Sequence, residues 1–375
     1  METFQKTFLN SVLVLLGLIL AFLLGYLTRA YLYGADFQVL EEAYVLLDTH
    51  GFNDLPESPA MEYGMIRGMV QAYGDPYTSF LEPVQRELES DVLEGKFGGI
   101  GVTLEKDAQD YWSLFPFPES PAARAGVQEG DRLVKVEDLD ISPETPVETI
   151  QAEVRGKVGT QVNITIARAP DFAPSEISIK REEIALPSVL GRIEPSESRL
   201  GIVQVNIIAA STPDEIQKTI EDLQKRGATH FALDLRNNGG GLLNSGVDIA
   251  RLFLEDGDVI QQQYRGKEVE TFEVEKPGAL VDIPLVVLVN EYTASASEII
   301  AGALQAHHRA LLIGATTYGK DTLQLVFTLH DGSSLHVTAA HWWIPGIEFP
   351  KDGHGLVPDI AVASDTNDPQ AITQA

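Results

Sequence analysis

Residues 314–324, GATTYGKDTLQ, place a lysine in a pattern that can be tested for phosphate binding. Gly314, Gly319 and Lys320 reproduce the spacing G-x-x-x-x-G-K. The next residue is Asp321, where a phosphate-binding loop needs a Ser or Thr hydroxyl for Mg²⁺. Such a loop must also open a helix, whereas the following residues alternate between apolar and polar around an Asp-Gly turn, which predicts a hairpin. The sequence therefore argues against nucleotide binding and leaves another role for Lys320.

Ser295 lies where a strand-like segment, LVNEYTASAS, runs into a helical one. Ser295 and Glu298 have the spacing of a capping box, and this interpretation makes the serine a helix N-cap. The functional interpretation makes it a nucleophile whose oxyanion intermediate is stabilised by the helix dipole and by adjacent N–H groups. Both interpretations suit the position, but they use the hydroxyl in different hydrogen bonds.

A glycine-rich loop, LDLRNNGGGLL at residues 233–243, follows another strand-like segment. Glycines let backbone N–H groups approach a ligand closely and turn toward it. A flexible turn would have the same composition. The loop is therefore a candidate for an anion-stabilising site only in combination with the other two loops.

A nucleophilic serine needs a base, and the sequence offers two kinds. No G-x-S-x-G elbow occurs, which disfavours an α/β-hydrolase. A Ser–His pair remains open through His307, His308 or His354, none of which lies in these loops. A lysine serves if burial lowers its pKa, and a shift from about 10.4 toward 7 corresponds to about 4–5 kcal/mol of disfavoured charge. Lys320 is the candidate for this role, although an isolated lysine in a loop is usually a solvated surface charge.

The elements that must hold these loops alternate between strand and helix from about residue 177. Short apolar runs, GIVQVNI, HFALDLR, PLVVLVN and RALLIG, are typical of strands buried on both faces of a sheet. Thr212-Pro-Asp-Glu215 has the pattern of a capping box with proline at the first helical position. This pattern predicts an α/β domain whose chemistry lies in the loops after the strands.

The chain before residue 177 has two further parts. Residues 36–92 carry helical patterns, whereas residues 97–170 are strand-like and have the size of a small β-rich module. Two prolines in APDFAPSE, residues 169–176, indicate a linker out of that module. The tail from Ser364 is polar, and we expect it to be disordered.

Composition excludes several classes of partner and site. Lys and Arg number 27 against 55 Asp and Glu, a formal net charge of −28. Such a surface repels nucleic acid, which is therefore not an expected ligand. The chain has no cysteine, and its histidines lack the H-E-x-x-H spacing, so we expect no metal and no cofactor.

The first thirty residues carry a long apolar run. No charge occurs between Lys6 and Arg29, and the residues from Phe8 to Leu27 are apolar apart from one Asn and one Ser. Twenty helical residues span about 30 Å, the thickness of a bilayer core. A cleaved signal peptide would have a shorter apolar region and a small-x-small site, which the following residues match poorly. We therefore expect an uncleaved single-pass anchor at residues 1–30, with the N-terminus inside.

Taken together and in order, these segments resemble the C-terminal (tail-specific) processing peptidases of family S41, serine proteases with a Ser-Lys dyad. The resemblance runs from about residue 38 to 363. It rests on GDPYTSFLEP (74–83), FGGIGV (97–102), SPAARAGVQEGDRLVKV (120–136), RGKVGTQV (155–162), LDLRNNGGG, TASASEIIAGALQ, GATTYGKDTLQ and GLVPDI (355–360). It implies an α/β fold, namely a crotonase/Clp-like protease core with an inserted β-rich PDZ domain.

The resemblance assigns catalytic roles to three side chains. Ser295 matches the nucleophile and Lys320 the general base, at the interval that the family pattern requires, 320 − 295 = 25. Gln324 matches the residue that orients the lysine. One position departs from the pattern, because Asp321 follows the lysine where the family usually has Gly. We expect its carboxylate to point to solvent, since an inward carboxylate would raise the pKa of the base.

The resemblance also assigns binding roles to two sets of backbone groups. The oxyanion hole falls on the N–H of Ala296 and on that of Gly240 or Gly241, between which the sequence does not choose. In the β-rich module, similar to a PDZ domain, the carboxylate-binding loop is Gly99, Ile100, Gly101 and Val102. We expect Ile100, Val102 and Val127 to line an apolar pocket beside it. In the family this module captures the C-terminus of a substrate and gates the active site.

The resemblance divides the chain into an anchor (1–30), a helical segment (36–92), a PDZ domain (93–172), the protease core (173–363) and a disordered tail (364–375). It implies a membrane-anchored serine endopeptidase that recognises protein or peptide C-termini and cuts by acyl transfer. Family members act outside the cytoplasmic membrane, so we expect an extracytoplasmic catalytic part. The alternative is a PDZ receptor or scaffold whose protease domain has decayed. The oligomeric state stays open, a homo-oligomer included.

Overall fold

The structure is a computed structural model that describes residues 15–25, 37–347 and 355–362. It divides into two compact units, residues 1–72 and 73–375, which are described separately. The predicted tail after residue 363 lies outside the described residues, as does His354.

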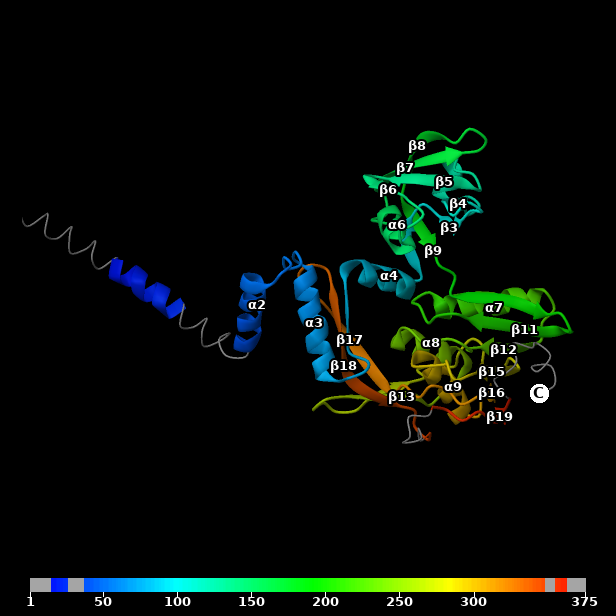
Figure 1. Ribbon diagram of the computed structural model, residues 1–375. Helices are drawn as coiled ribbons and strands as arrows, with labels where there is room; N and C mark the ends of the chain where they lie inside the picture. The colour runs from blue at the N-terminus through cyan, green and yellow to red at the C-terminus, as the bar shows by residue number, and fades with distance from the viewer. Residues whose placement is uncertain (1–14, 26–36, 348–354, 363–375) are drawn as a thin grey trace, which may run out of the picture. The chain divides into compact units, whose positions relative to one another are not determined.

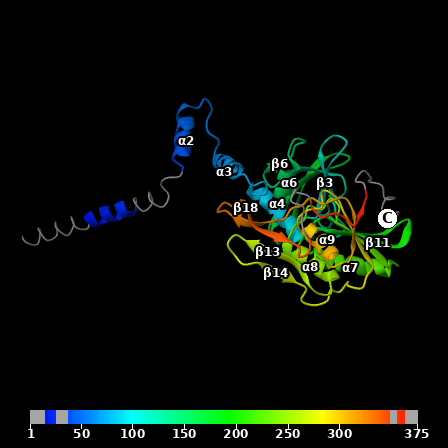
Figure 2. The same ribbon diagram turned by 90° about the horizontal axis from the view of Figure 1, so that it is seen from below.

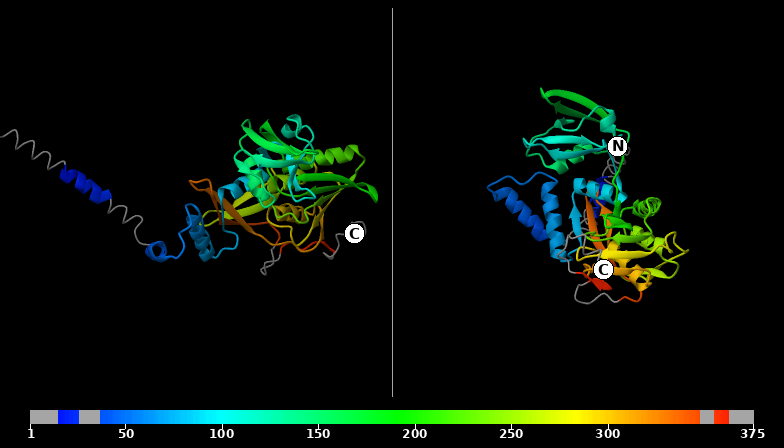
Figure 3. Two further views of the ribbon diagram at one scale, coloured as in Figure 1. Left: turned by 45° about the horizontal axis from the view of Figure 1, so that its top comes forward. Right: turned by 90° about the vertical axis from the view of Figure 1, so that its right-hand side faces the viewer.

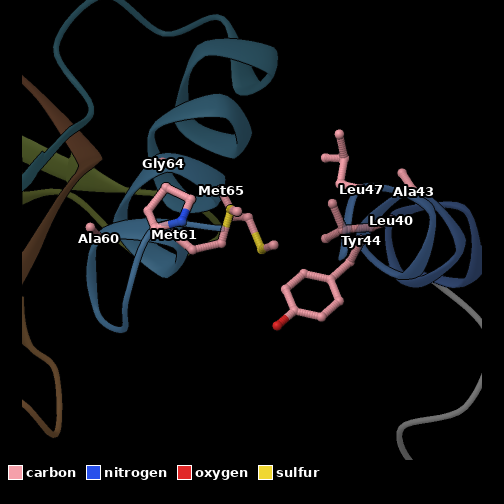
Figure 4. Close-up of a pocket in the computed structure, with 9 residues that line it drawn as sticks. Leu40, Ala43, Tyr44, Leu47, Ala60, Met61, Gly64 and Met65 are labelled. Carbon is pink, nitrogen blue, oxygen red and sulfur yellow. The ribbon is translucent and has the colours of Figure 1, made fainter. Parts of the chain in front are cut away.

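The first unit contains two helices where the periodicity predicts them, α2 (Gln38–His50) and α3 (Ala60–Tyr73). Helix α2 buries none of its side chains. An apolar hollow of about 360 Å³ is lined by side chains from both helices and from the segment between them (Figure 4). The lining residues are Leu40, Ala43, Tyr44, Leu47, Pro56, Ala60, Met61, Gly64 and Met65. None of them is a predicted site residue.

The prediction of a membrane anchor is overturned. Residues 15–25 are helical, and a helix of that length spans about 16 Å, roughly half of a bilayer core. Within the described ranges, no helix has both the length and the apolar character that a membrane span requires. The rest of the predicted span lies outside those ranges. This corrects the expectation of a single-pass protein of the cytoplasmic membrane with an extracytoplasmic catalytic part.

In the second unit, the predicted α/β core is built on a six-stranded sheet (Figure 1). In spatial order, its strands are β10 (Val189–Glu194), β11 (Glu197–Val205), β12 (His230–Asp234), β15 (Leu285–Val289), β16 (Leu311–Gly314) and β19 (Ile360–Ala361). All neighbours from β11 to β19 are parallel, and β10 is antiparallel to β11. Helices α7 (Thr212–Lys225), α8 (Leu243–Phe253) and α9 (Ala296–Ala306) bury apolar faces in the same core. The loops that leave β12 and β15 therefore start at one edge of the sheet.

The capping box predicted at the start of α7 is not formed. The N-cap is Ser211, so Thr212 is already helical. The Oε2 atom of Glu215 accepts hydrogen bonds from the backbone N–H of Ser188 (2.8 Å) and of Val189 (3.2 Å). Glu215 therefore fixes the chain just before β10. Thr212 fixes it just after β11, because its Oγ1 accepts from the N–H of Ala209. The two residues do not cap each other.

The hairpin predicted after Lys320 is present in a second sheet. Strands β17 (Thr322–Thr328) and β18 (Ser334–Trp343) pair antiparallel around the Asp331-Gly332 turn. Strand β18 also pairs with β1 (Ser79–Leu81) and β13 (Asp258–Tyr264), and β13 pairs with β14 (Glu270–Glu273) (Figure 2). The sheet thus brings residues near position 79 to the hairpin that follows the lysine.

The β-rich module forms its own sheet of β3 (Val102–Lys106), β4 (Trp112–Pro116), β5 (Asp131–Val136), β7 (Gln161–Arg168) and β8 (Ala173–Lys180), with β6 (Leu139–Asp140) paired to β5 (Figure 3). Helices α5 (Pro121–Arg124) and α6 (Val147–Val154) accompany it. Before it, α4 (Pro83–Glu94) leads into β2 (Lys96–Gly99), which pairs with β9 (Glu182–Ala185). The predicted linker at 169–176 is wrong from residue 173 onward, because β8 pairs with β7 throughout. An edge strand accommodates Pro174, since its outer side needs no donor.

Candidate active site

Ser295 lies on a sharp turn between a strand and a helix. Strand β15 ends at Val289, and α9 begins at Ala296. The backbone of Ser295 has φ 56° and ψ −122°. An ordinary N-cap is extended, and a residue other than glycine pays about 1–3 kcal/mol for such a conformation. Strained serines of this kind occur where a hydroxyl must stand clear of the turn that carries it. No sequence motif indicated this strain.

The glycine-rich loop is tied to the serine turn through Asn238, a fully buried side chain. Its Nδ2 donates to the carbonyl of Val205 (2.7 Å), and its Oδ1 accepts from the N–H of Gly240 (2.9 Å). The carbonyl of Asn238 accepts from the N–H of Ala294, next to the serine (3.0 Å). The two predicted loops therefore meet.

Gly240 directly borders the serine. A Cβ atom at Gly240 would lie 2.9 Å from the Cβ of Ser295 and 3.0 Å from the N atom of Ala296. At Gly241 a Cβ atom would instead lie 2.2 Å from the carbonyl oxygen of Ile208. Both glycines have positive φ, 99° and 149°. Each position thus excludes a side chain for a separate reason, and at Gly240 the excluded space borders the serine.

Lys320 is half-buried, and its ammonium group lies beside Gln324 and Tyr77. Its Nζ donates to Oε1 of Gln324 (2.7 Å) and lies 5.0 Å from the centre of the Tyr77 ring. Burial lowers the pKa of Lys320 below its usual value, and the negative charges of Asp75 and Glu298 oppose this shift. Tyr77 and Asp75 belong to the GDPYTSF segment, to which the sequence assigned no role.

Two hydrogen bonds hold the amide of Gln324 so that its oxygen points toward Lys320. Its Nε2 donates to Oγ1 of Thr322 (3.2 Å) and of Thr338 (3.4 Å), both on the hairpin. Asp321, the residue that departs from the family pattern, is half-exposed, and its Oδ2 lies 3.5 Å from Nδ1 of the exposed His341. Its carboxylate therefore has a partner at the surface.

Glu298 connects the serine turn to the lysine loop. Its side chain is fully buried on α9. Its Oε2 accepts from the backbone N–H of Ser295 (2.8 Å) and of Lys320 (3.0 Å). Its Oε1 accepts from the N–H of Gly319 (2.7 Å) and from Oγ1 of Thr317 (2.6 Å). The sequence indicated only the bond to Ser295, because the capping-box spacing accounts for the glutamate locally.

The four residues of the predicted carboxylate-binding loop run from the end of β2 to the start of β3: Gly99 ends β2, Ile100 and Gly101 connect the strands, and Val102 begins β3. The carbonyl of Ile100 accepts a hydrogen bond from the N–H of Ala122 (2.9 Å), and the carbonyl of Gly101 accepts one from the N–H of Phe117 (2.9 Å). Gly101 has φ 70°, and a Cβ atom there would lie 2.6 Å from Cβ of Ser120. Ile100 and Val127, which we expected to line a pocket, are buried in the core of the module, and Val102 packs against that core.

Comparison with known proteins identifies the two modules. The sequence pattern of peptidase family S41 matches residues 199–362, and that of the PDZ domain matches residues 118–168. A carboxyl-terminal-processing protease of Picosynechococcus sp. is 35% identical over 304 residues, which cover 80% of this chain and 72% of that protein.

Two further proteins are similar over most of this chain. The carboxy-terminal processing protease CtpA of Bacillus subtilis is 32% identical over 309 residues, 82% of this chain and 65% of that protein, so the chain spans just under two thirds of it. The structure of a photosystem II D1 C-terminal processing protease is 27% identical, covers 91% of both chains and superposes with a TM-score of 0.49. The identity and coverage of the relatives confirm the predicted family. The chain belongs to peptidase family S41, the C-terminal-processing serine proteases, and contains a PDZ domain.

Proposed function

We propose that this chain is a serine endopeptidase that recognises protein C-termini through its PDZ domain and cleaves peptide bonds with a dyad of Ser295 and Lys320. The observation that carries the proposal is the set of hydrogen bonds around Glu298, which joins the turn of Ser295 to the loop of Lys320. Burial of Lys320 supports the role of base, because it lowers the pKa of the lysine. Protein or peptide substrates are the partners that such a site takes.

In the proposed mechanism, neutral Lys320 accepts the proton of the Ser295 hydroxyl as the oxygen attacks the scissile carbonyl. The ammonium then donates this proton to the leaving amine, and a water molecule hydrolyses the acyl-enzyme. Gln324 accepts a hydrogen bond from Nζ and so orients the lysine side chain. The backbone N–H groups of Ala296 and Gly241 stabilise the oxyanion, since the N–H of Gly240 already donates to Asn238. Gly240 leaves the space that the oxyanion needs.

We also propose one change to the predicted domain limits. The PDZ domain, placed at 93–172, extends to Lys180, because β8 pairs with β7 over its full length. The protease core then begins with the strands that follow. The helical segment at 36–92 and the tail at 364–375 stay predictions.

The proposed base predicts a specific dependence on pH. Only neutral lysine accepts the serine proton, and burial lowers its pKa, so the neutral form exists at pH values below the usual 10.5. We expect kcat/KM for an uncharged peptide substrate to rise with pH and to reach its plateau at a lower pH than a solvent-exposed lysine would give. Initial rates across the pH range, with folding checked by circular dichroism at each pH, measure this. A rate that falls with pH, or one that rises only above pH 10, would exclude Lys320 as the base.

Recognition of C-termini predicts that a free carboxylate is needed at the end of a substrate. Charge-assisted hydrogen bonds to such a carboxylate contribute about 1.5–3 kcal/mol each. Amidation of a good peptide substrate should therefore weaken its binding at least about tenfold. Fluorescence anisotropy and cleavage rates of the matched free-acid and amidated peptides test this. Equal binding and cleavage of both would leave a general protease, whereas binding without cleavage would favour the decayed scaffold.

A further inference from the structure

We propose that Glu298 is a positioning residue for the dyad, holding the Ser295 turn and the Lys320 loop together and presenting a fixed negative charge to the lysine. The proposal rests on the proposed dyad, and it adds a residue that acts through both of its members. Its basis is a buried carboxylate whose four hydrogen-bond donors come from two segments of the chain.

The four donors saturate the carboxylate without neutralising it. Each oxygen accepts two bonds, from Ser295 and Lys320 on Oε2 and from Thr317 and Gly319 on Oε1. All four donors are neutral N–H or O–H groups. A fully buried charge is tolerated only when its hydrogen-bonding capacity is satisfied, so displacement of either segment leaves the carboxylate under-bonded. Glu298 therefore favours the arrangement in which both segments are in place.

A third segment closes the site around the carboxylate. At Gly355 a Cβ atom would lie 2.3 Å from Oε1 of Glu298 and 2.1 Å from Oγ1 of Thr317. The N–H of Leu356 donates to Oγ1 of Thr317 (2.7 Å), and the N–H of Gly355 donates to the carbonyl of Thr317 (3.1 Å). The GLVPDI motif thus packs against Thr317, one of the two donors to Oε1, which leaves the glutamate little freedom to move.

The charge has a consequence for the base. Burial raises the pKa of Glu298, and its four hydrogen bonds act in the opposite direction. The titratable groups that act on Lys320 are Asp75 and Glu298, whose negative charges raise the pKa of the lysine, and Tyr77 lies against its ammonium. Removal of the Glu298 charge should therefore lower the pKa of Lys320, even though it also loosens the site.

Glu298→Gln separates this role from a purely structural one. The amide keeps the shape but removes the charge, and its NH₂ group faces backbone donors. We expect kcat to fall at least about tenfold with KM within about twofold, and the rising limb of the pH profile to move down by about half a unit or more. Glu298→Asp keeps the charge at a shorter reach, so kcat should fall while the limb stays in place.

Glu215→Gln is the matched control. Glu215 also accepts two backbone N–H bonds, from Ser188 and Val189 where β10 begins, and it has no bond to the lysine loop within the part of the chain that the structure describes. We expect Glu215→Gln to keep the kcat of the wild type and the position of the rising limb of its pH profile. A folded Glu298→Gln protein with wild-type kcat, or with reduced kcat and an unmoved limb, would overturn the proposal. If that variant does not fold, a limb shifted in Glu298→Asp would overturn it and an unmoved limb would support it.

A second readout does not depend on proteolysis. The pH dependence of reductive methylation at Lys320, followed by mass spectrometry, reports the pKa of the lysine directly. It should shift downward in Glu298→Gln and stay unchanged in Glu215→Gln. If the wild type cleaves no peptide, the proposed function fails, and the methylation shift still decides whether Glu298 acts on the lysine.

Discussion

Ser295→Ala and Lys320→Ala should each abolish peptide cleavage and leave a folded protein. Alanine at 295 removes the nucleophile, and alanine at 320 removes the base, so either change should lower kcat by about 10³-fold or more. Neither change removes the backbone N–H groups that donate to Glu298. Hydrolysis of a free-acid peptide, measured by chromatography, and thermal unfolding, measured by circular dichroism, test the two parts of the prediction.

Ser297→Ala is the control for the serine. Ser297 lies two residues further on and is fully buried. Its Oγ has no hydrogen-bond partner within the part of the chain that the structure describes. Its removal therefore breaks no bond, and activity should stay within about twofold of wild type. Near-normal turnover in either dyad variant, or a loss confined to Ser297→Ala, would refute the assignment of nucleophile and base.

Gly240→Ala should lower kcat/KM by at least about 100-fold, since it fills the space beside the nucleophile. The new methyl group would lie 2.8 Å from the carbonyl oxygen of Ala294, 2.9 Å from Cβ of Ser295 and 3.0 Å from the N atom of Ala296. These atoms belong to the backbone or are attached to it, so none can swing away. A φ of 99° adds strain for any residue with a Cβ. We also expect a lower temperature of unfolding.

The neighbouring glycine provides a matched comparison. At Gly239 a Cβ atom would have no heavy atom within 4 Å, and φ lies outside the left-handed region. Gly239→Ala should therefore keep activity within about twofold of wild type. Peptide hydrolysis and thermal unfolding of both variants measure the contrast. Equal activity of the two would show that the space beside Ser295 is not used in catalysis.

Local patterns predicted much of the architecture. The apolar runs that became β11, β12, β15 and β16 and the hairpin around Asp331-Gly332 form where the sequence indicates them. Hydrophobic period and turn residues act over a few positions, so these features can be read without a tertiary structure. The same reasoning was wrong at Pro174, because whether a strand lies at an edge depends on its neighbours.

The sequence by itself determined the family and the candidate residues Ser295, Lys320 and Gln324, since each occurs within a short motif whose order along the chain is specific. It did not determine the backbone strain at Ser295, nor the bonds from Glu298 to Lys320, because the capping-box spacing already explained that glutamate locally. Composition also predicted a membrane span in the apolar N-terminal run, whereas no helix among the described residues is long and apolar enough to cross a membrane. Contacts between residues 22 positions apart form only when the sheet and the hairpin bring their loops together. The tertiary structure therefore decided how the candidate residues are held.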